Sequence, residues 1–219
     1  MSAWENRDET QYEYHQGNVN FDIREGDIII DGGGCFGDTA LEFANKAGEK
    51  GKVFSFEFVG VNLEIFNKNL ALNPELTRRI EIVQKALWKN SNEELFFSYD
   101  LQGDGSGAAK CVPDKPQNIE SSYASKIETI SIDDFVSQNN LPRVDFIKLD
   151  IEGAEYECLQ GAKETIKKFK PRIAVCIYHK DEDFIRIPAY LKELVPEYKL
   201  YLNHHTDMIE ETVLYAMID

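Results

Sequence analysis

Residues 28–37 read Ile28-Ile29-Ile30-Asp31-Gly32-Gly33-Gly34-Cys35-Phe36-Gly37, an apolar run followed by one carboxylate and a cluster of glycines. This pattern predicts a buried strand that runs into a tight turn, because glycine adopts backbone conformations closed to other residues and lets a ligand approach the main chain. Asp38 and Thr39 begin a predicted helix whose first backbone amides face the same turn. The turn is therefore predicted to bind a small-molecule cofactor.

The glycines also match a dinucleotide-binding spacing, G-x-G-x-x-G, and Glu57 ends the next predicted strand twenty residues after Gly37. An acidic residue at that position accepts hydrogen bonds from ribose hydroxyls, which NAD, FAD and S-adenosylmethionine all carry. Asp31 helps to distinguish these ligands, because its carboxylate repels a pyrophosphate and attracts an ammonium group. S-adenosylmethionine has an ammonium group and no phosphate, so it is the predicted cofactor, and NAD is the alternative.

The composition is that of an ordinary globular protein, with 42% hydrophobic and 11% aromatic residues among 219. We expect a single domain over residues 1–219, in which residues 1–20 form a polar N-terminal segment. The 24 basic and 39 acidic residues give a net charge of −15, which disfavours nucleic acid and anionic membranes as partners. The sequence contains neither an apolar stretch of bilayer length nor a signal-peptide core, so we expect a cytoplasmic protein.

Segments with strand and helix patterns alternate along the chain, which is typical of an α/β fold with a largely parallel, doubly wound sheet. The last two predicted strands, 199–202 and 212–217, are separated by about nine polar residues, too few for the helix of a parallel crossover. They are therefore predicted to pair as an antiparallel hairpin. Further strands are predicted at 28–31, 53–58, 80–84, 95–99, 144–150 and 173–178, and one helix is predicted to present Leu159, Ala162, Ile166 and Phe169 on its buried face.

A polar segment from Asp100 to Lys126 contains Gly103-Asp104-Gly105-Ser106-Gly107. A connection of this length within a domain is usually functional or disordered. We therefore consider a lid that closes over the bound ligands, with an irregular surface loop as the alternative.

The carboxyl ends of the parallel strands are where a doubly wound sheet binds its ligands. The predicted ends are Asp31, Glu57, Asp150 and His179, so these side chains should converge. Glu155 fits the general preference of carboxylates for the start of a helix. Asp150, at the end of an apolar strand, does not fit that preference and indicates a functional role.

Four motifs follow one another in a consistent order over roughly residues 20–217 and are more specific together than the glycines alone. They are Asp31-x-Gly33-x-x-x-Gly37, Phe56-Glu57, Lys148-x-Asp150-x-Glu152-Gly153-Ala154-Glu155 and Glu211-Thr212-Val213-Leu214-Tyr215-Ala216. This series resembles the FkbM-type methyltransferases. The resemblance implies a class I methyltransferase fold, which is Rossmann-like and ends in an antiparallel hairpin, with S-adenosylmethionine as the methyl donor.

The resemblance also implies a hydroxyl acceptor on a sugar, a polysaccharide or a natural product. By the same resemblance, Asp31, Gly33 and Gly37 line the methionine end of the cofactor, and Glu57 holds its ribose. Ala86 and Leu87, just after the third strand, are expected near the adenine.

The predicted catalytic residues are His179, Asp150 and Glu152. An imidazole at a strand end can take the proton of the acceptor hydroxyl as the methyl group is transferred, and Asp150 can orient the acceptor or act as the base instead. Lys148, Tyr178 and His204 are predicted to contact the acceptor.

Asp150, Glu152, His179 and His204 also form a mixed oxygen and nitrogen set that suits a divalent cation. The sequence does not bring these four to ligand distances, so no metal site is predicted from it.

The function predicted from the sequence is an S-adenosylmethionine-dependent O-methyltransferase that acts on a sugar, a polysaccharide or another small polar acceptor. The alternatives are an NAD-dependent oxidoreductase and a non-catalytic module that binds S-adenosylmethionine or a glycan. The terminal hairpin and Asp31 argue against the oxidoreductase.

Overall fold

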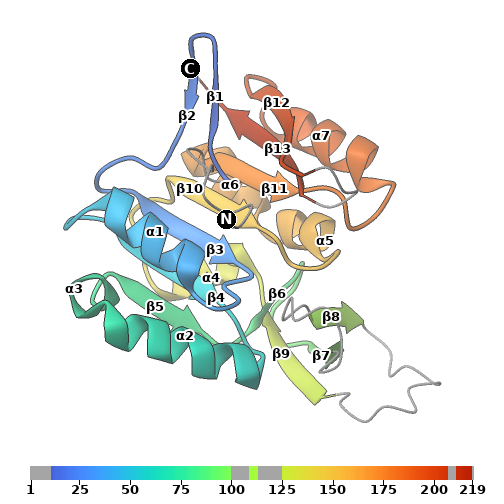
Figure 1. The fold of residues 1–219 in the computed structure, drawn as a ribbon. Helices are drawn as coiled ribbons and strands as arrows, with labels where there is room; N and C mark the ends of the chain where they lie inside the picture. The colour runs from blue at the N-terminus through green and yellow to red at the C-terminus, as the bar shows by residue number, and fades with distance from the viewer. Residues whose placement is uncertain (1–10, 100–108, 113–124, 207–210, 219) are drawn as a thin grey trace.

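The computed structural model describes residues 11–99, 109–112, 125–206 and 211–218, and in this part of the chain a seven-stranded sheet forms the centre of the fold (Figure 1). Neighbouring strands are parallel except where β13 pairs with β11 on one side and with β12 on the other. The α/β fold and the terminal hairpin predicted from the sequence are therefore confirmed. In spatial order the strands are β12 (Lys199–His204), β13 (Thr212–Met217), β11 (Arg172–Cys176), β10 (Phe146–Leu149), β3 (Ile28–Gly32), β4 (Lys52–Phe56) and β5 (Ile80–Val83).

Helices cover both faces of this sheet. Neighbouring residues of a strand point to opposite faces, so Ile29 packs with α1 and α2, whereas Ile30 packs with α4, α5, α6 and α7. The result is three layers, helix on sheet on helix, with a separate apolar core on each side of the sheet. The helices are α1 (Asp38–Ala47), α2 (Gly60–Leu72), α3 (Pro74–Thr77), α4 (Ile132–Gln138), α5 (Glu155–Gln160), α6 (Lys163–Phe169) and α7 (Asp183–Leu194).

Two smaller sheets were not predicted in full. β1 (Tyr14–Gln16) and β2 (Val19–Phe21) form an antiparallel hairpin that begins in the segment expected to be polar, residues 1–20, and ends one residue beyond it. A second sheet has the strand order β6-β9-β7-β8, and only β7 was predicted as a strand. The proposed lid at residues 103–107 lies outside the described residues. The bounds are β6 (Ala86–Leu87), β7 (Glu94–Tyr99), β8 (Ala109–Val112) and β9 (Ser125–Ile130).

The prediction of a single helix that carries Leu159 and Phe169 on one face is wrong. The segment is divided into α5 and α6 at Gly161, which caps α5. A Cβ on Gly161 would lie 2.3 Å from the carbonyl oxygen of Trp88, so the backbones approach too closely there for any larger residue. The break between α5 and α6 therefore lies where the chain packs against the segment that contains Trp88. The periodicity of apolar residues in the helix gives no sign of this contact.

None of the helices in the described part of the chain is both long enough and apolar enough to cross a membrane.

Candidate active site

The turn after β3 requires glycine at two positions. Gly33 has a φ of +83° and Gly37 a φ of +80°, a left-handed region that strains any residue with a side chain. A Cβ on Gly33 would lie 1.9 Å from the carbonyl oxygen of Asp150, and one on Gly37 would lie 2.1 Å from the ring of Phe66. The turn therefore lies directly against the end of β10, and it is held from behind by α2.

Asp31 is fully buried below this turn and is already paired. Its Oδ2 accepts a 2.6 Å hydrogen bond from the hydroxyl of Ser55, and its Oδ1 lies 3.1 Å from Nζ of Lys148. Burial alone would lower the pKa of Lys148, but the charges of Asp31 and then Asp150 outweigh it and raise that pKa above its ordinary value. The same ammonium group donates to the carbonyl oxygens of Gly32 and Gly33 at 2.9 and 2.6 Å. Lys148 thus braces the glycine turn.

This geometry bears on the expectations for Asp31 and Lys148. The ammonium group next to Asp31 belongs to the protein itself, because the Lys148 side chain, 2% exposed, fills that position. The ammonium group of Lys148 contacts the carbonyl oxygens of Gly32 and Gly33 and a carboxylate oxygen of Asp31, and its predicted contact with an acceptor stays a prediction.

Glu57, just after β4, is 6% exposed and accepts four hydrogen bonds. Oε1 accepts from the backbone amides of Phe58 and Val59 at 2.7 Å each, and Oε2 accepts from the amide of Cys35 at 2.9 Å and from Asn62 at 3.2 Å. Burial raises the pKa of Glu57, although these hydrogen bonds oppose the shift. The carboxylate is thereby fixed beside the glycine turn.

Cys35 lies in the same turn with a φ of +44°. Burial, followed by the charges of Glu57 and Asp38, raises the pKa of its thiol to about 12. The thiol is therefore protonated at neutral pH.

Asp150 follows β10 and is held by two tyrosines. Oδ2 accepts a 2.8 Å hydrogen bond from the hydroxyl of Tyr12, and Oδ1 accepts one of 3.3 Å from the hydroxyl of Tyr178. Burial, then the charge of Asp150, raises the pKa of the Tyr12 hydroxyl well above its ordinary value, so this group remains a donor. Tyr12 comes from the N-terminal segment and also places its ring 5.1 Å from Nζ of Lys148.

His179, after β11, lies among three carboxylates. Nε2 lies 3.6 Å from Oδ1 of Asp150 and 3.6 Å from Oε2 of Glu152, and Nδ1 lies 2.9 Å from Oε1 of Glu155. Burial alone would lower the pKa of His179, but the contact with Glu155 and the charges of Asp150 and Glu152 raise it. Of the four strand ends predicted to converge, Asp31, Glu57, Asp150 and His179, the last two are therefore in contact, and Glu152 joins them.

His204 is not part of this group. It lies at the end of β12, exposed, where Nδ1 lies 2.8 Å from the hydroxyl oxygen of Thr212. No hydrogen bond or ion pair among the described residues connects it to Asp150 or His179. Ala86 and Leu87 are buried in β6, and Cδ1 of Leu87 lies 3.0 Å from the position of a Cβ on Gly32, so this strand borders the glycine turn.

The sequence analysis missed Tyr12 and Ser55 and understated Glu155. Nothing in the spacing of the polar N-terminal segment indicates that Tyr12 folds back onto Asp150. Glu155 does begin α5, as the preference for acid at a helix start suggests, but it is also fully buried against His179. The available signal in the sequence was that Glu155 comes four residues after Ile151. The backbone amide of Ile151 donates to Oε1 of Glu155 at 2.9 Å.

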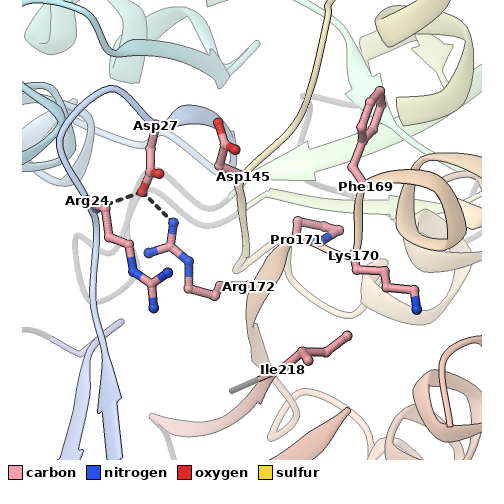
Figure 2. Close-up of a pocket in the computed structure, with 8 residues that line it drawn as sticks. All are labelled: Arg24, Asp27, Asp145, Phe169, Lys170, Pro171, Arg172 and Ile218. Carbon is pink, nitrogen blue, oxygen red and sulfur yellow. Dashed lines mark hydrogen bonds and ion pairs between the residues drawn. The ribbon is translucent and has the colours of Figure 1, made fainter. Parts of the chain in front are cut away.

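A pocket of about 230 Å³ lies elsewhere, at the amino ends of β3, β10 and β11 (Figure 2). In Figure 2, Asp27 accepts from the backbone amide of Arg24 and from the guanidinium of Arg172, each at 2.7 Å. None of the predicted site residues lines this pocket. It lies at the edge of the sheet opposite to the candidate active site.

The family model described as the methyltransferase FkbM domain matches residues 31–208. The chain belongs to the FkbM methyltransferase domain family. The match includes the glycine turn, Glu57 and the cluster around His179, so the family resemblance in the sequence is confirmed. No curated protein matches the sequence.

Solved structures support the fold. An FkbM methyltransferase from Methylobacillus flagellatus has a TM-score of 0.67 at 23% identity, over 91% of this chain and 45% of its own. This FkbM-family chain therefore spans less than half the length of that protein. Fibrillarin from Aeropyrum pernix, with natively bound S-adenosylmethionine, has a TM-score of 0.54 at 13% identity, over 91% of this chain and 70% of its own. A precorrin-6y C5,15-methyltransferase from Geobacter metallireducens has a TM-score of 0.51 at 12% identity, over 90% of this chain and 82% of its own.

Proposed function

We propose that the protein transfers a methyl group from S-adenosylmethionine to a hydroxyl of a sugar, a polysaccharide or another small polar acceptor. One observation carries the proposal: the glycine turn and the cluster around Asp150 adjoin, since Gly33 leaves no room for a Cβ against the Asp150 carbonyl. A donor bound at the turn and an acceptor bound at the cluster would be neighbours. Membership of the FkbM family supports a methyl donor at the turn.

In this proposal the cofactor lies along the carboxyl ends of β3 and β4. Gly33 and Gly37 let its methionine end approach the backbone of the turn, while Asp31 acts through Lys148 to hold that backbone in place. Glu57, already oriented by four donors, accepts from the ribose hydroxyls. Ala86 and Leu87 provide an apolar border for the adenine.

Methyl transfer forms the bond from the acceptor oxygen to the methyl carbon and breaks the bond from that carbon to the sulfonium sulfur. The acceptor hydroxyl loses its proton to the group formed by His179, Asp150 and Glu152, which contains an imidazole with carboxylates 3.6 Å away. Tyr178, whose ring centre lies 4.1 Å from that of His179, contacts the acceptor and holds Asp150 in place. Because a sulfonium is a reactive donor, alignment of the oxygen contributes more than proton transfer.

The proposed acceptor is small and polar. Nucleic acid is not proposed as an acceptor, because the net charge of −15 opposes binding of a phosphate backbone. His204 is the outermost residue proposed to contact it, since β12 ends at the same edge of the sheet as β11.

The test is release of S-adenosylhomocysteine from labelled S-adenosylmethionine in the presence of free and nucleotide-linked sugars, with amines as the contrasting acceptors. We expect label on a hydroxyl, and a loss of about 100-fold or more in Asp150→Asn, in keeping with the loss of both positioning and acid–base catalysis. Asp181→Asn is the matched control, because Asp181 is exposed and lies two residues beyond His179. Label on amines alone would contradict O-methylation, and full activity in Asp150→Asn would remove the proposed acceptor site.

A further inference from the structure

Buried polar atoms at the centre of the His179 cluster have no aligned hydrogen-bond partner. The His179 side chain is 7% exposed and that of Glu155 is fully buried. Nδ1 of His179 lies 2.9 Å from Oε1 of Glu155, but Nε2 of His179, with its nearest carboxylates at 3.6 Å, and Oε2 of Glu155 have no hydrogen-bond partner. Because buried polar atoms are almost always hydrogen-bonded, two such atoms at one place point to a ligand between them.

The same atoms are arranged as ligands of one ion. An oxygen of Asp150, an oxygen of Glu155 and a nitrogen of His179 lie within 4.8 Å of one another. Ligand bonds of about 2.0–2.2 Å place opposite ligands of one ion roughly 4 Å apart, so small side-chain rotations suffice. The three residues come from the end of β10, the start of α5 and the end of β11, which are fixed elements of the fold.

The charge of the cluster also favours a cation. Asp150, Glu152 and Glu155 surround a single imidazole, and within the described ranges no lysine or arginine forms an ion pair with Asp150 or Glu155. Lys148, whose pKa the charge of Asp150 helps to raise, forms its ion pair with Asp31, and Lys180, next to His179 in sequence, lies 3.7 Å from Glu157. The other histidine and carboxylate group, Glu13, His15 and Asp22, differs in this respect because Lys46 forms ion pairs with both acids.

We propose that Asp150, Glu155 and His179 bind a divalent transition-metal cation. Two carboxylates and one imidazole form a set intermediate between oxygen-rich magnesium sites and nitrogen-rich zinc sites, so Mn²⁺ is the first ion to test and Zn²⁺ the second. His204, which the sequence placed among the possible ligands, is not included. The sequence predicted no metal site, because it does not bring candidate ligands to ligand distances, and it assigned Glu155 only to the start of a helix.

The role of the ion in methyl transfer rests on the proposed function, whereas its binding does not. A cation at this position holds the acceptor oxygen and lowers the pKa of the acceptor hydroxyl. His179 is then a ligand, and Glu152, whose Oε2 lies 3.6 Å from Nε2 of His179, is the carboxylate placed to receive the proton.

The experiment is a titration of the chelator-treated, dialysed protein with MnCl₂, in which free Mn²⁺ is followed by its electron paramagnetic resonance signal, and a competition with ZnCl₂. We expect one ion per chain for the wild type and for the control Asp181→Asn, and binding about tenfold or more weaker in Asp150→Asn and His179→Ala. Circular dichroism and S-adenosylhomocysteine binding on the same samples show whether each variant is folded.

Absence of Mn²⁺ and Zn²⁺ binding to the folded wild type would overturn the metal site, as would unchanged binding in a folded Asp150→Asn or His179→Ala protein. Cation binding without S-adenosylhomocysteine binding would retain the metal site and contradict the methyltransferase proposal. Binding of S-adenosylhomocysteine without binding of a cation would retain the methyltransferase proposal and reject the metal site.

Discussion

The ion pair between Asp31 and Lys148 is the residue-scale feature on which the conformation of the glycine turn depends. Both side chains are at most 2% exposed, and Lys148 reaches two carbonyl oxygens of the turn as well as Asp31. Removal of one member leaves an uncompensated buried charge, which is much more costly than the pair itself is favourable.

We therefore expect Lys148→Met to lower the free energy of unfolding by about 3–5 kcal/mol, as measured by urea denaturation. Lys126→Met is the control, because Lys126 and its partner Glu94 are 54% and 63% exposed, and such a surface pair contributes less than about 1 kcal/mol. The double variant Asp31→Asn with Lys148→Met should recover part of the loss. Equal effects of Lys148→Met and Lys126→Met would show that the buried pair does not brace the turn.

At the residue scale the sequence identified Asp31, Glu57, Asp150 and His179 because each lies at or just beyond the carboxyl end of a strand, and parallel strands bring these ends to one edge. It did not predict that Lys148 neutralises Asp31. Alternation along a strand indicates which side chains share a face, but it does not indicate which of them pair with each other.

At the scale of elements, the break between α5 and α6 shows where helical periodicity is insufficient. Leu159 and Ile166 belong to one core cluster, as their spacing predicts, yet Gly161 separates their helices. The cause is a backbone contact with Trp88 and Lys89, which follow β6. β1, β8 and β9 were missed for a related reason, because short strands depend on partners that are distant in sequence.

We expect Gly161→Ala to destabilise the protein by about 1–3 kcal/mol, because its Cβ would meet backbone atoms that cannot rotate away. Gly60→Ala is the matched control: Gly60 begins α2, has open space around its Cβ position, and should leave stability unchanged or raise it by about 0.5–1 kcal/mol. Thermal or urea unfolding of both variants measures the difference. A stabilised Gly161→Ala would indicate that α5 and α6 can fuse.

At the scale of the whole molecule, the strand order brings the carboxyl ends of the parallel strands β3, β4, β10 and β11 to one edge of the sheet (Figure 1), which is where the two neighbouring sites are proposed. The alternation of elements and the short final connection predicted this architecture, since few topologies satisfy both. The contribution of Tyr12 could not be predicted, because it depends on the N-terminal segment returning to Asp150 across 138 residues of sequence.

The most direct test of this account is calorimetric titration of the protein with S-adenosylhomocysteine, with NADH in parallel, for the wild type, Glu57→Ala and the exposed control Glu64→Ala. We predict that S-adenosylhomocysteine binds the wild type and Glu64→Ala equally and that Glu57→Ala weakens binding about tenfold or more, since hydrogen bonds to a charged group contribute about 1.5–3 kcal/mol. Binding of NADH alone, or S-adenosylhomocysteine binding unaffected in a folded Glu57→Ala protein, would contradict the proposed cofactor site.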